Sequence, residues 1–116
     1  MVRKFSMVLF FAVLFGLLTT VSVFAGPRPP NGRYVETQYN RGTILLHYMP
    51  ARQLWEISIF DNRGNLQGSY ETRDFDDSTN YIIRFRHNNA NCYVNWSSNT
   101  LYVSLGGSPY MYRHQP

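Results

Sequence analysis

Short runs of β-branched and aromatic residues recur about every ten residues from position 34 onward, with Asn, Gly and Asp between them. Runs of this length that are bounded by turn residues are typical of β-strands. The sequence carries no window of useful length with the 3.6-residue periodicity of a helix. We predict seven strands and a short eighth segment, at residues 34–39, 43–49, 53–60, 66–72, 81–87, 92–97, 100–105 and 110–113.

Apolar and polar residues alternate within the predicted strands. Trp55, Ile57 and Ile59 alternate with Glu56 and Ser58, and later strands show the same pattern. One apolar face per strand is what two antiparallel sheets packed face to face require. The sequence therefore predicts an all-β fold, an antiparallel two-sheet β-sandwich of about seven strands like immunoglobulin and fibronectin domains, with a small β-barrel as the alternative.

The turns between the predicted strands are well marked. Asp61 begins the segment DNRGN, in which Gly64 supplies the positive φ of a hairpin with a bulge. Asn-containing segments at 88–91 and 97–99 mark two further turns, because Asn tolerates the left-handed region. Residues 81–105 are therefore a predicted three-stranded meander. The acidic segment 74–80 is a predicted crossover between the sheets.

The beginning of the chain predicts export. Arg3 and Lys4 precede an apolar run from Met7 to Leu18, and small residues stand at Val23 and Ala25. This order is that of a secretory signal peptide. We predict a signal peptide over residues 1–25, cleavage after Ala25, and a secreted or periplasmic protein. The alternative is an uncleaved membrane anchor, because residues 5–24 are long enough to span a bilayer.

The chain that follows the predicted cleavage site is one domain. Cleavage leaves 91 of the 116 residues. Residues 26–32 (GPRPPNG) are a predicted flexible entry segment, and residues 33–116 form a single β-sandwich domain. After cleavage the chain has nine Arg and seven acidic residues, which gives a net charge of +2. This small excess gives none of the clustered positive field of a nucleic-acid-binding protein, so we predict no nucleic-acid partner. We also predict no membrane partner after cleavage, because residues 26–116 contain no second apolar span and no cysteine near the cleavage site for a lipid anchor.

Cys92 is the single cysteine of the chain, so an internal disulfide is impossible. It alternates with Val94 and Trp96 along one predicted strand. Because free cysteine is among the most buried residue types, we expect Cys92 in the core. A disulfide to a second chain and a reactive thiol are the alternatives. The domain must then fold by packing alone, without the disulfides that small exported domains often use.

The stretches WEISIFDNRGNLQGSYET, TNYIIRF and CYVNWSSNTLYVSL resemble small secreted proteins of gut bacteria that carry an immunoglobulin-like domain. The shared pattern is a strand, a D-x-x-G-N hairpin, a second strand and a closing meander, over residues 43–105. The chain lacks the core Cys–Cys pair of antibody domains. The resemblance implies a signal peptide and one short sandwich. It implies no active site, because those proteins have no assigned function.

Strand alternation places five polar and aromatic side chains on one exposed face: Arg84, Arg86, Tyr93, Asn95 and Tyr102. Tyr rings stack on sugars, and Arg and Asn supply hydrogen bonds from a rigid sheet. The sequence therefore favours a secreted, non-catalytic binding or adhesion domain whose ligand is a glycan or a surface protein. The same side chains would also serve as cross-strand pairs that only stabilise a solvated sheet.

A small secreted hydrolase or nuclease is the alternative function. The residue types that it needs are present as Glu36, Glu56, His47, His87, Arg84 and Arg86. Their spacing matches no recognisable catalytic pattern. His114 is the third histidine, and no two histidines have the close spacing of a metal site. We therefore predict no catalytic residue, no metal ligand and no cofactor.

Three other features have an open interpretation. Asp74, Asp76 and Asp77 carry oxygen ligands for Ca²⁺, but their segment lacks the glycine and the ligand spacing of an EF-hand loop. Asn95-Trp96-Ser97 matches the N-glycosylation pattern, which matters only in a eukaryotic host. Residues 109–112 (PYMY) are predicted to lie on an exposed sheet edge and to cover it. If this tail is instead mobile, a homodimer through the uncovered edge is a further hypothesis.

Overall fold

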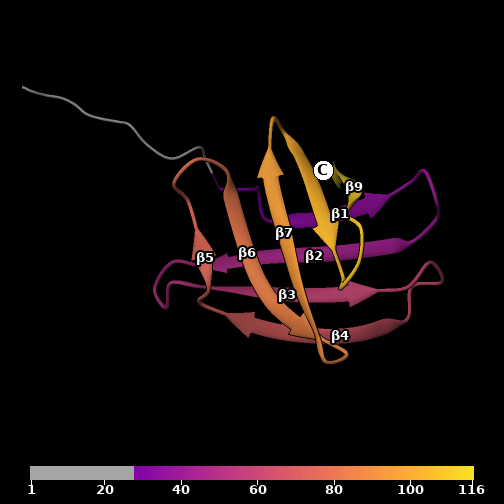
Figure 1. Ribbon diagram of the computed structural model, residues 1–116, viewed down its shortest axis with the longest axis horizontal. Coiled ribbons are helices and arrows are strands. Elements are labelled where there is room, and N and C mark those ends of the chain that lie inside the picture. The colour runs from indigo at the N-terminus through magenta and orange to yellow at the C-terminus, as the bar shows by residue number, and fades with distance from the viewer. Residues whose placement is uncertain (1–27) are drawn as a thin grey trace, which may run out of the picture.

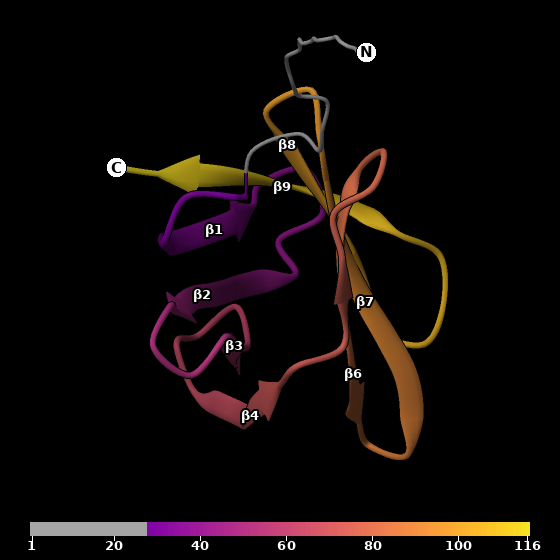
Figure 2. The ribbon, with the colours of Figure 1, turned by 90° about the vertical axis from the view of Figure 1, so that its left-hand side faces the viewer.

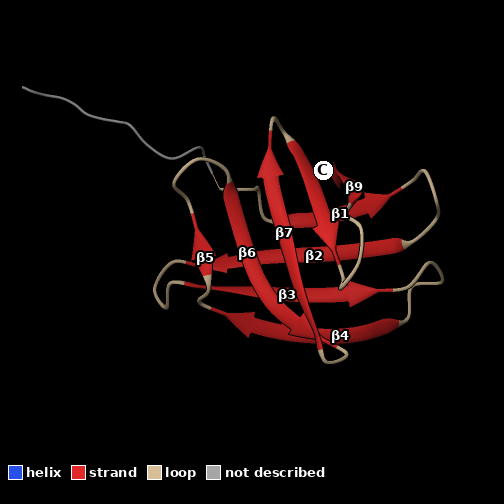
Figure 3. Cartoon of the chain, in the orientation of Figure 1, coloured by secondary structure: helices blue, strands red, loops and turns tan. Residues whose placement is uncertain are grey.

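The computed structural model describes residues 28–116. The predicted signal peptide and its cleavage site at Ala25 lie outside the described residues. No helix that could span a membrane occurs within residues 28–116. This part of the chain forms antiparallel strands joined by turns and loops (Figure 3). The strands are β1 (Gly32–Glu36), β2 (Gly42–Met49), β3 (Leu54–Phe60), β4 (Leu66–Thr72), β5 (Phe75–Asp76), β6 (Tyr81–His87), β7 (Ala90–Ser97), β8 (Thr100–Ser104) and β9 (Tyr110–Gln115).

The nine strands form one continuous sheet in the order β4-β3-β2-β1-β9-β8-β7-β6-β5. Strand β9 joins the two halves of this sheet, because residues 113–115 pair with β1 and residues 110–112 pair with β8. The structure thus confirms the all-β, antiparallel fold. It corrects the predicted sandwich of seven strands in two separate sheets to a nearly closed, barrel-like sheet of nine strands, which is nearer to the alternative prediction.

The two halves of the sheet face each other across the core. Strands β1–β4 form one half and β5–β8 form the other (Figure 2). In Figure 1, β6, β7 and β8 run steeply across the direction of β1–β4. Each half is amphipathic, so the apolar faces of the two halves can cover each other only if the sheet folds over on itself. Strand β9 is the bend at which it does so.

The core side chains follow the alternation that the sequence predicts. Cys92 is buried as expected, and burial raises the pKa of its thiol. Leu105 is the last residue of the strand predicted over residues 100–105, but β8 ends at Ser104 and Leu105 is exposed. The buried apolar cluster consists of Tyr34, Ile44, Leu46, Trp55, Ile57, Ile59, Tyr81, Ile83, Phe85, Cys92, Val94, Trp96, Leu101, Val103 and Tyr112.

Strand β9 is the clearest departure from the sequence interpretation. The sequence predicts the tail at residues 109–112 on an exposed edge, but β9 lies inside the sheet between β1 and β8. The folded-over sheet leaves β1 and β8 without a second neighbour, and the tail supplies backbone partners to both while burying Tyr112. The end strands of the sheet are therefore β4 and β5. A homodimer through a sheet edge, which stays a prediction, would have to use one of these.

The segment that precedes β1 contacts the sheet. The guanidinium of Arg28 lies 4.2 Å from the ring centroid of Tyr48, and the side-chain oxygen of Asn31 accepts a hydrogen bond from the Tyr48 backbone N–H. The buried hydroxyl of Tyr34 donates to the Pro30 carbonyl, and this burial raises the pKa of Tyr34. Part of the predicted entry segment thus packs against β1 and β2.

The β1–β2 connection is organised by one buried carboxylate. Glu36 is 2% exposed and accepts hydrogen bonds from the backbone N–H groups of Gln38, Tyr39 and Arg41 at 2.9–3.0 Å. The connection then enters β2 at Gly42, which has a φ of +116°. A side chain is thus used to satisfy the backbone of a loop that has no strand partner.

The β3–β4 hairpin turns at Asp61, as the sequence predicts. One oxygen of its carboxylate accepts hydrogen bonds from the backbone N–H groups of Arg63 and Asn65, both at 2.9 Å. These bonds lower the pKa of Asp61, the one from Asn65 most strongly. Gly64 has the expected positive φ of +85°.

Acid is therefore expected to weaken this hairpin. Because the pKa of Asp61 is lower in the folded chain than its unfolded value of about 3.9, its stabilising contribution is present above that pH and is lost as the pH falls through the folded pKa. An NMR titration of the Asp61 carboxyl should give a midpoint below about 3.9. The Asp61→Asn variant should show a shallower loss of stability over the same pH range. A midpoint at or above the unfolded value would contradict this expectation.

Candidate functional site

The five candidate residues lie on one face of the β5–β8 half of the sheet, directed away from the core. This outer face is set by strand register, in which Arg84 of β6 stands opposite Tyr93 of β7, and Asn95 of β7 stands opposite Tyr102 of β8. Arg86 follows Arg84 on the same side of β6. The alternation of β6, β7 and β8 was thus sufficient to place these side chains on a common face.

An open groove of about 1020 Å³ crosses part of this outer face. Four of the five candidates line it, and Tyr102 does not. The groove also contains residues that the sequence analysis did not single out, above all Tyr70, Glu71 and Thr72 of β4. Its complete lining is Tyr70, Glu71, Thr72, Asp74, Ile82, Arg84, Phe85, Arg86, Asn91, Cys92, Tyr93 and Asn95.

The groove exists because the crossover after β4 brings that strand beside β6. The Thr72 hydroxyl donates to the Arg84 carbonyl at 2.8 Å, and the Arg84 backbone N–H donates to the Asp74 carbonyl at 2.8 Å. These two bonds hold the end of β4 against the middle of β6. The two strands do not pair along their length, and the space between them opens onto the outer face.

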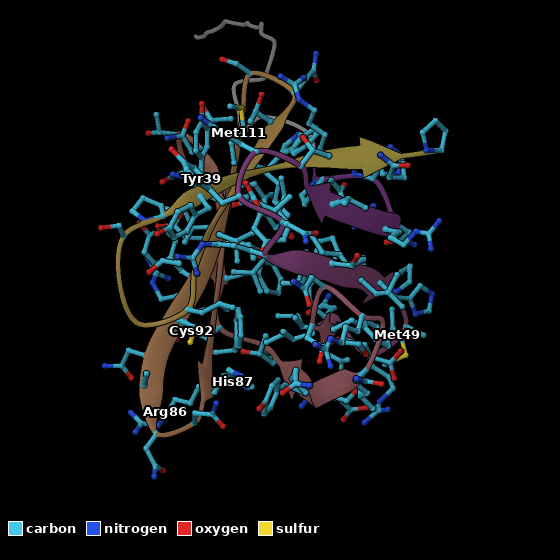
Figure 4. All side chains as sticks on the ribbon, turned by 90° about the vertical axis from the view of Figure 1, so that its right-hand side faces the viewer. Tyr39, Met49, Arg86, His87, Cys92 and Met111 are labelled. Carbon is cyan, nitrogen blue, oxygen red and sulfur yellow. The ribbon has the colours of Figure 1, made fainter. Side chains whose placement is uncertain are left out.

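The far end of the β4–β6 contact is closed by aromatic side chains. The rings of Tyr70 and Phe85 stack with centroids 5.9 Å apart, and the Tyr70 hydroxyl hydrogen-bonds to Nδ1 of His87. His87 is buried and turns toward β4, whereas Arg86 lies on the opposite side of β6 (Figure 4). His87 is therefore a structural contact between the two halves of the sheet. It does not line the groove.

The charges along the groove are mostly compensated. Arg84 forms an ion pair with Asp74 at 3.3 Å, and Glu71 forms one with Arg52 at 3.7 Å. Arg86 differs, because it donates to two neutral oxygens, the side-chain oxygen of Asn91 at 2.7 Å and the carbonyl of Asn89 at 2.9 Å. It contacts no carboxylate within the part of the chain that the structure describes.

Asn95 occupies an unusual position in the groove. Its side-chain oxygen is buried and has no hydrogen-bond partner, the one such atom among residues 28–116. An unpaired buried acceptor costs about 1–3 kcal/mol, so it stands out in a small domain. The residue lies in the middle of β7, between Val94 and Trp96, both of which are buried. The sequon that it begins is thus part of a paired strand and not of a loop.

The residues considered for acid–base catalysis do not converge at one site, and the one pair that forms lies away from the arginines. Glu36 is buried in the β1–β2 connection, and His87 is bound to Tyr70. His47 and Glu56 contact each other at 3.2 Å on β2 and β3, with half-exposed side chains, in the other half of the sheet from Arg84 and Arg86. His114 packs against the ring of Tyr34, 4.9 Å away. The arrangement gives the hydrolase alternative little support.

The acidic crossover has contacts of its own. Asp74 pairs with Arg84, and the Asp76 carboxylate accepts a hydrogen bond from the Ser78 backbone N–H at 2.9 Å, which lowers the pKa of Asp76. No cluster of three or more His, Cys, Asp or Glu side chains suited to a metal ion occurs in residues 28–116.

The chain matches no protein-family model, no curated protein and no solved structure. The resemblance to small secreted immunoglobulin-like proteins therefore stays a prediction from the sequence pattern.

Proposed function

We propose that this protein is an exported, non-catalytic binding domain, and that it holds a glycan in the groove beside β4, β6 and β7. The proposed export follows from the leader sequence. A surface protein is the alternative ligand. The observation that carries the proposal is the groove itself, in which Tyr93, Asn95 and Arg84 converge with Tyr70 from a distant part of the chain.

The chemistry of the groove suits a sugar. Sugar rings present apolar faces that stack on tyrosine and hydroxyl edges that exchange hydrogen bonds with amides and guanidinium groups. Tyr93 offers such a ring, and Asn91, Asn95 and Arg84 offer the polar groups around it. A hydroxyl of the ligand that donates to the Asn95 oxygen would remove the cost of the unpaired acceptor, after a small rotation of the amide.

A protein ligand has weaker support. Stable protein interfaces bury about 800 Å² on each partner around an apolar centre. The described groove is concave, and its lining combines polar residues of several types with apolar surface from its tyrosines, Ile82 and Phe85, the mixture that the apolar faces and the hydroxyl edges of a sugar ring need. Pre-formed hydrogen bonds, such as that from Arg84 to Asp74, hold this polar lining in place before a ligand arrives.

Two tyrosines of the same outer face test the proposal. Tyr93 lines the groove and Tyr102 does not, although both are on β-strands that lie side by side. We expect Tyr93→Ala to weaken glycan binding about tenfold, since a stacked aromatic contact contributes about 0.5–1.5 kcal/mol beyond its buried area. Tyr102→Ala should change the affinity less than about twofold.

The measurement is a glycan-array screen of the protein without its leader, followed by calorimetric titration of the two variants. Thermal unfolding of both variants serves as the control for folding. Equal loss of affinity in the two variants would show that the ligand covers the whole face and not the groove. A folded protein that binds no glycan in the screen would overturn the proposal and leave the surface-protein ligand.

A further inference from the structure

We infer that the ligand of the groove is an acidic sugar, a carboxylated or sulfated one, and that Arg86 binds its anionic group. This ligand class rests on the proposed glycan-binding function.

Arg86 carries the positive charge that the groove leaves uncompensated. Of the four charged side chains that line the groove, Asp74 and Arg84 pair with each other, and Glu71 pairs with Arg52 outside it. Arg86 alone contacts neutral partners within the described chain. An anion bound there would meet a positive charge that is paired with neither of the groove's two carboxylates, Glu71 and Asp74.

Arg86 is also held in place before a ligand binds. One terminal nitrogen donates to the Asn91 side chain and the other to the Asn89 carbonyl, within the β6–β7 turn. A guanidinium carries five N–H donors, so these two bonds leave donors free for the paired oxygens of a carboxylate or sulfate. A fixed guanidinium loses less conformational entropy on binding than a free surface arginine does.

The position of Arg86 relative to Tyr93 fits a single acidic sugar residue. Arg86 stands opposite Asn91, and Tyr93 is the next residue of β7 on the same face. Diagonal neighbours of this kind lie roughly 7–8 Å apart. A pyranose ring stacked on Tyr93 therefore brings a substituent at its edge within reach of the Arg86 side chain, which is long enough to approach it.

The test uses one oligosaccharide in two charge states. We choose galacturonic acid oligomers and the same oligomers with every carboxylate methyl-esterified, because the sugar ring is unchanged and only the charge is removed. A sulfated oligosaccharide of similar length separates carboxylate from sulfate recognition. The wild-type protein without its leader should bind the acidic or the sulfated oligomer at least tenfold more tightly than the ester.

Three variants assign this preference to Arg86. Arg86→Ala should lower the affinity for the anionic oligomer to that for the ester and leave the affinity for the ester within twofold. Arg86→Lys should recover only part of the preference, because an ammonium retains the charge without the planar fork. Arg33→Ala removes an exposed arginine from β1, in the other half of the sheet, and should leave the preference intact.

The outcomes separate this inference from the glycan proposal. If the wild-type protein binds the ester as tightly as the acid and sulfate, the inference is wrong and the glycan proposal stands. If it binds neither these oligomers nor any glycan of the array, the glycan proposal fails and the inference fails with it. A preference for the anion that survives Arg86→Ala in a folded variant would overturn the role of Arg86. The comparison of acid with ester needs no variant, so it decides the ligand class even if Arg86→Ala does not fold.

Discussion

Replacing Glu36 with alanine is expected to lower the free energy of unfolding by about 3 kcal/mol or more. The substitution removes the acceptor of three backbone N–H groups at once, those of Gln38, Tyr39 and Arg41. A hydrogen bond to a charged group contributes about 1.5–3 kcal/mol, and water in this exposed loop would replace part of that loss. For a small domain with a total stability of about 5–15 kcal/mol, the expected loss is a large fraction of the whole.

Urea unfolding of Glu36→Ala measures this loss of stability. Glu56→Ala is the matched control. Glu56 is also a strand glutamate, but it is half exposed, and its ion-pair partner His47 is exposed as well. Its removal should cost less than about 1 kcal/mol, as surface ion pairs do. Similar unfolding midpoints for the two variants would contradict the structural role of Glu36. Glu36→Gln should lie between them, because an amide keeps one acceptor oxygen but turns an N–H donor toward the loop.

The second large effect is expected at Gly42, where an alanine should destabilise the fold by about 3–5 kcal/mol. Its φ of +116° is one that residues with a side chain rarely adopt. A Cβ at this position would also lie 2.3 Å from the Phe60 carbonyl oxygen and 2.8 Å from the Asp61 carbonyl carbon. Both neighbours are backbone atoms of the adjacent strand end, so β2 and β3 would have to separate locally.

Gly64→Ala is the matched control for the contribution of backbone conformation alone. Gly64 also has a positive φ, but a Cβ there would meet nothing within 4 Å. We expect Gly64→Ala to lower the free energy of unfolding by about 1–2 kcal/mol, because alanine is strained in the left-handed backbone region. The free energies of unfolding of the two variants, measured by thermal and urea unfolding, should therefore differ by about 1–4 kcal/mol. Equal effects would mean that steric contact with Phe60 does not constrain the β1–β2 connection.

The β1–β2 connection also bears on function. The sequence offers Glu36 as one of two glutamates for an acid–base mechanism, and the structure buries it as the acceptor for a loop. His87 is similarly bound to Tyr70. Each of these side chains already has a structural partner, which is why the groove, lined by arginine, asparagine and tyrosine, is the better-supported site.

The sequence predicted correctly the features that depend on a single strand and its adjoining turn, such as which side chains are buried and where the chain turns. Alternation in Tyr81–His87 determined which side chains are buried, and it placed Arg84 and Arg86 on the outer face. The Asp61–Gly64 turn was predictable because its hydrogen bonds join residues at most four apart. The burial of Cys92 followed from its alternation with Val94 and Trp96.

Two features of the groove were beyond the reach of such local patterns. Tyr70 comes from β4 and meets Phe85 and His87 of β6, which lie fifteen or more positions away in the chain. The residue pattern of β4 or of β6 does not predict that hydrogen bonds at Thr72 and Asp74 hold the two strands together. The unpartnered Asn95 oxygen is likewise a property of its surroundings and not of its position in β7.

The sequence by itself determined eight of the nine strands, apart from the short β5 and the bounds of β1, together with the turns and the composition of the outer face. These features depend on side-chain alternation and on contacts between near neighbours. Only the tertiary structure decided that the tail closes the two halves as β9 and that β4 reaches β6 to form a groove. Alternation states which face of a strand is apolar but not which strand lies beside it. That choice is made by backbone pairing and core packing between distant segments, here between β9 and both β1 and β8.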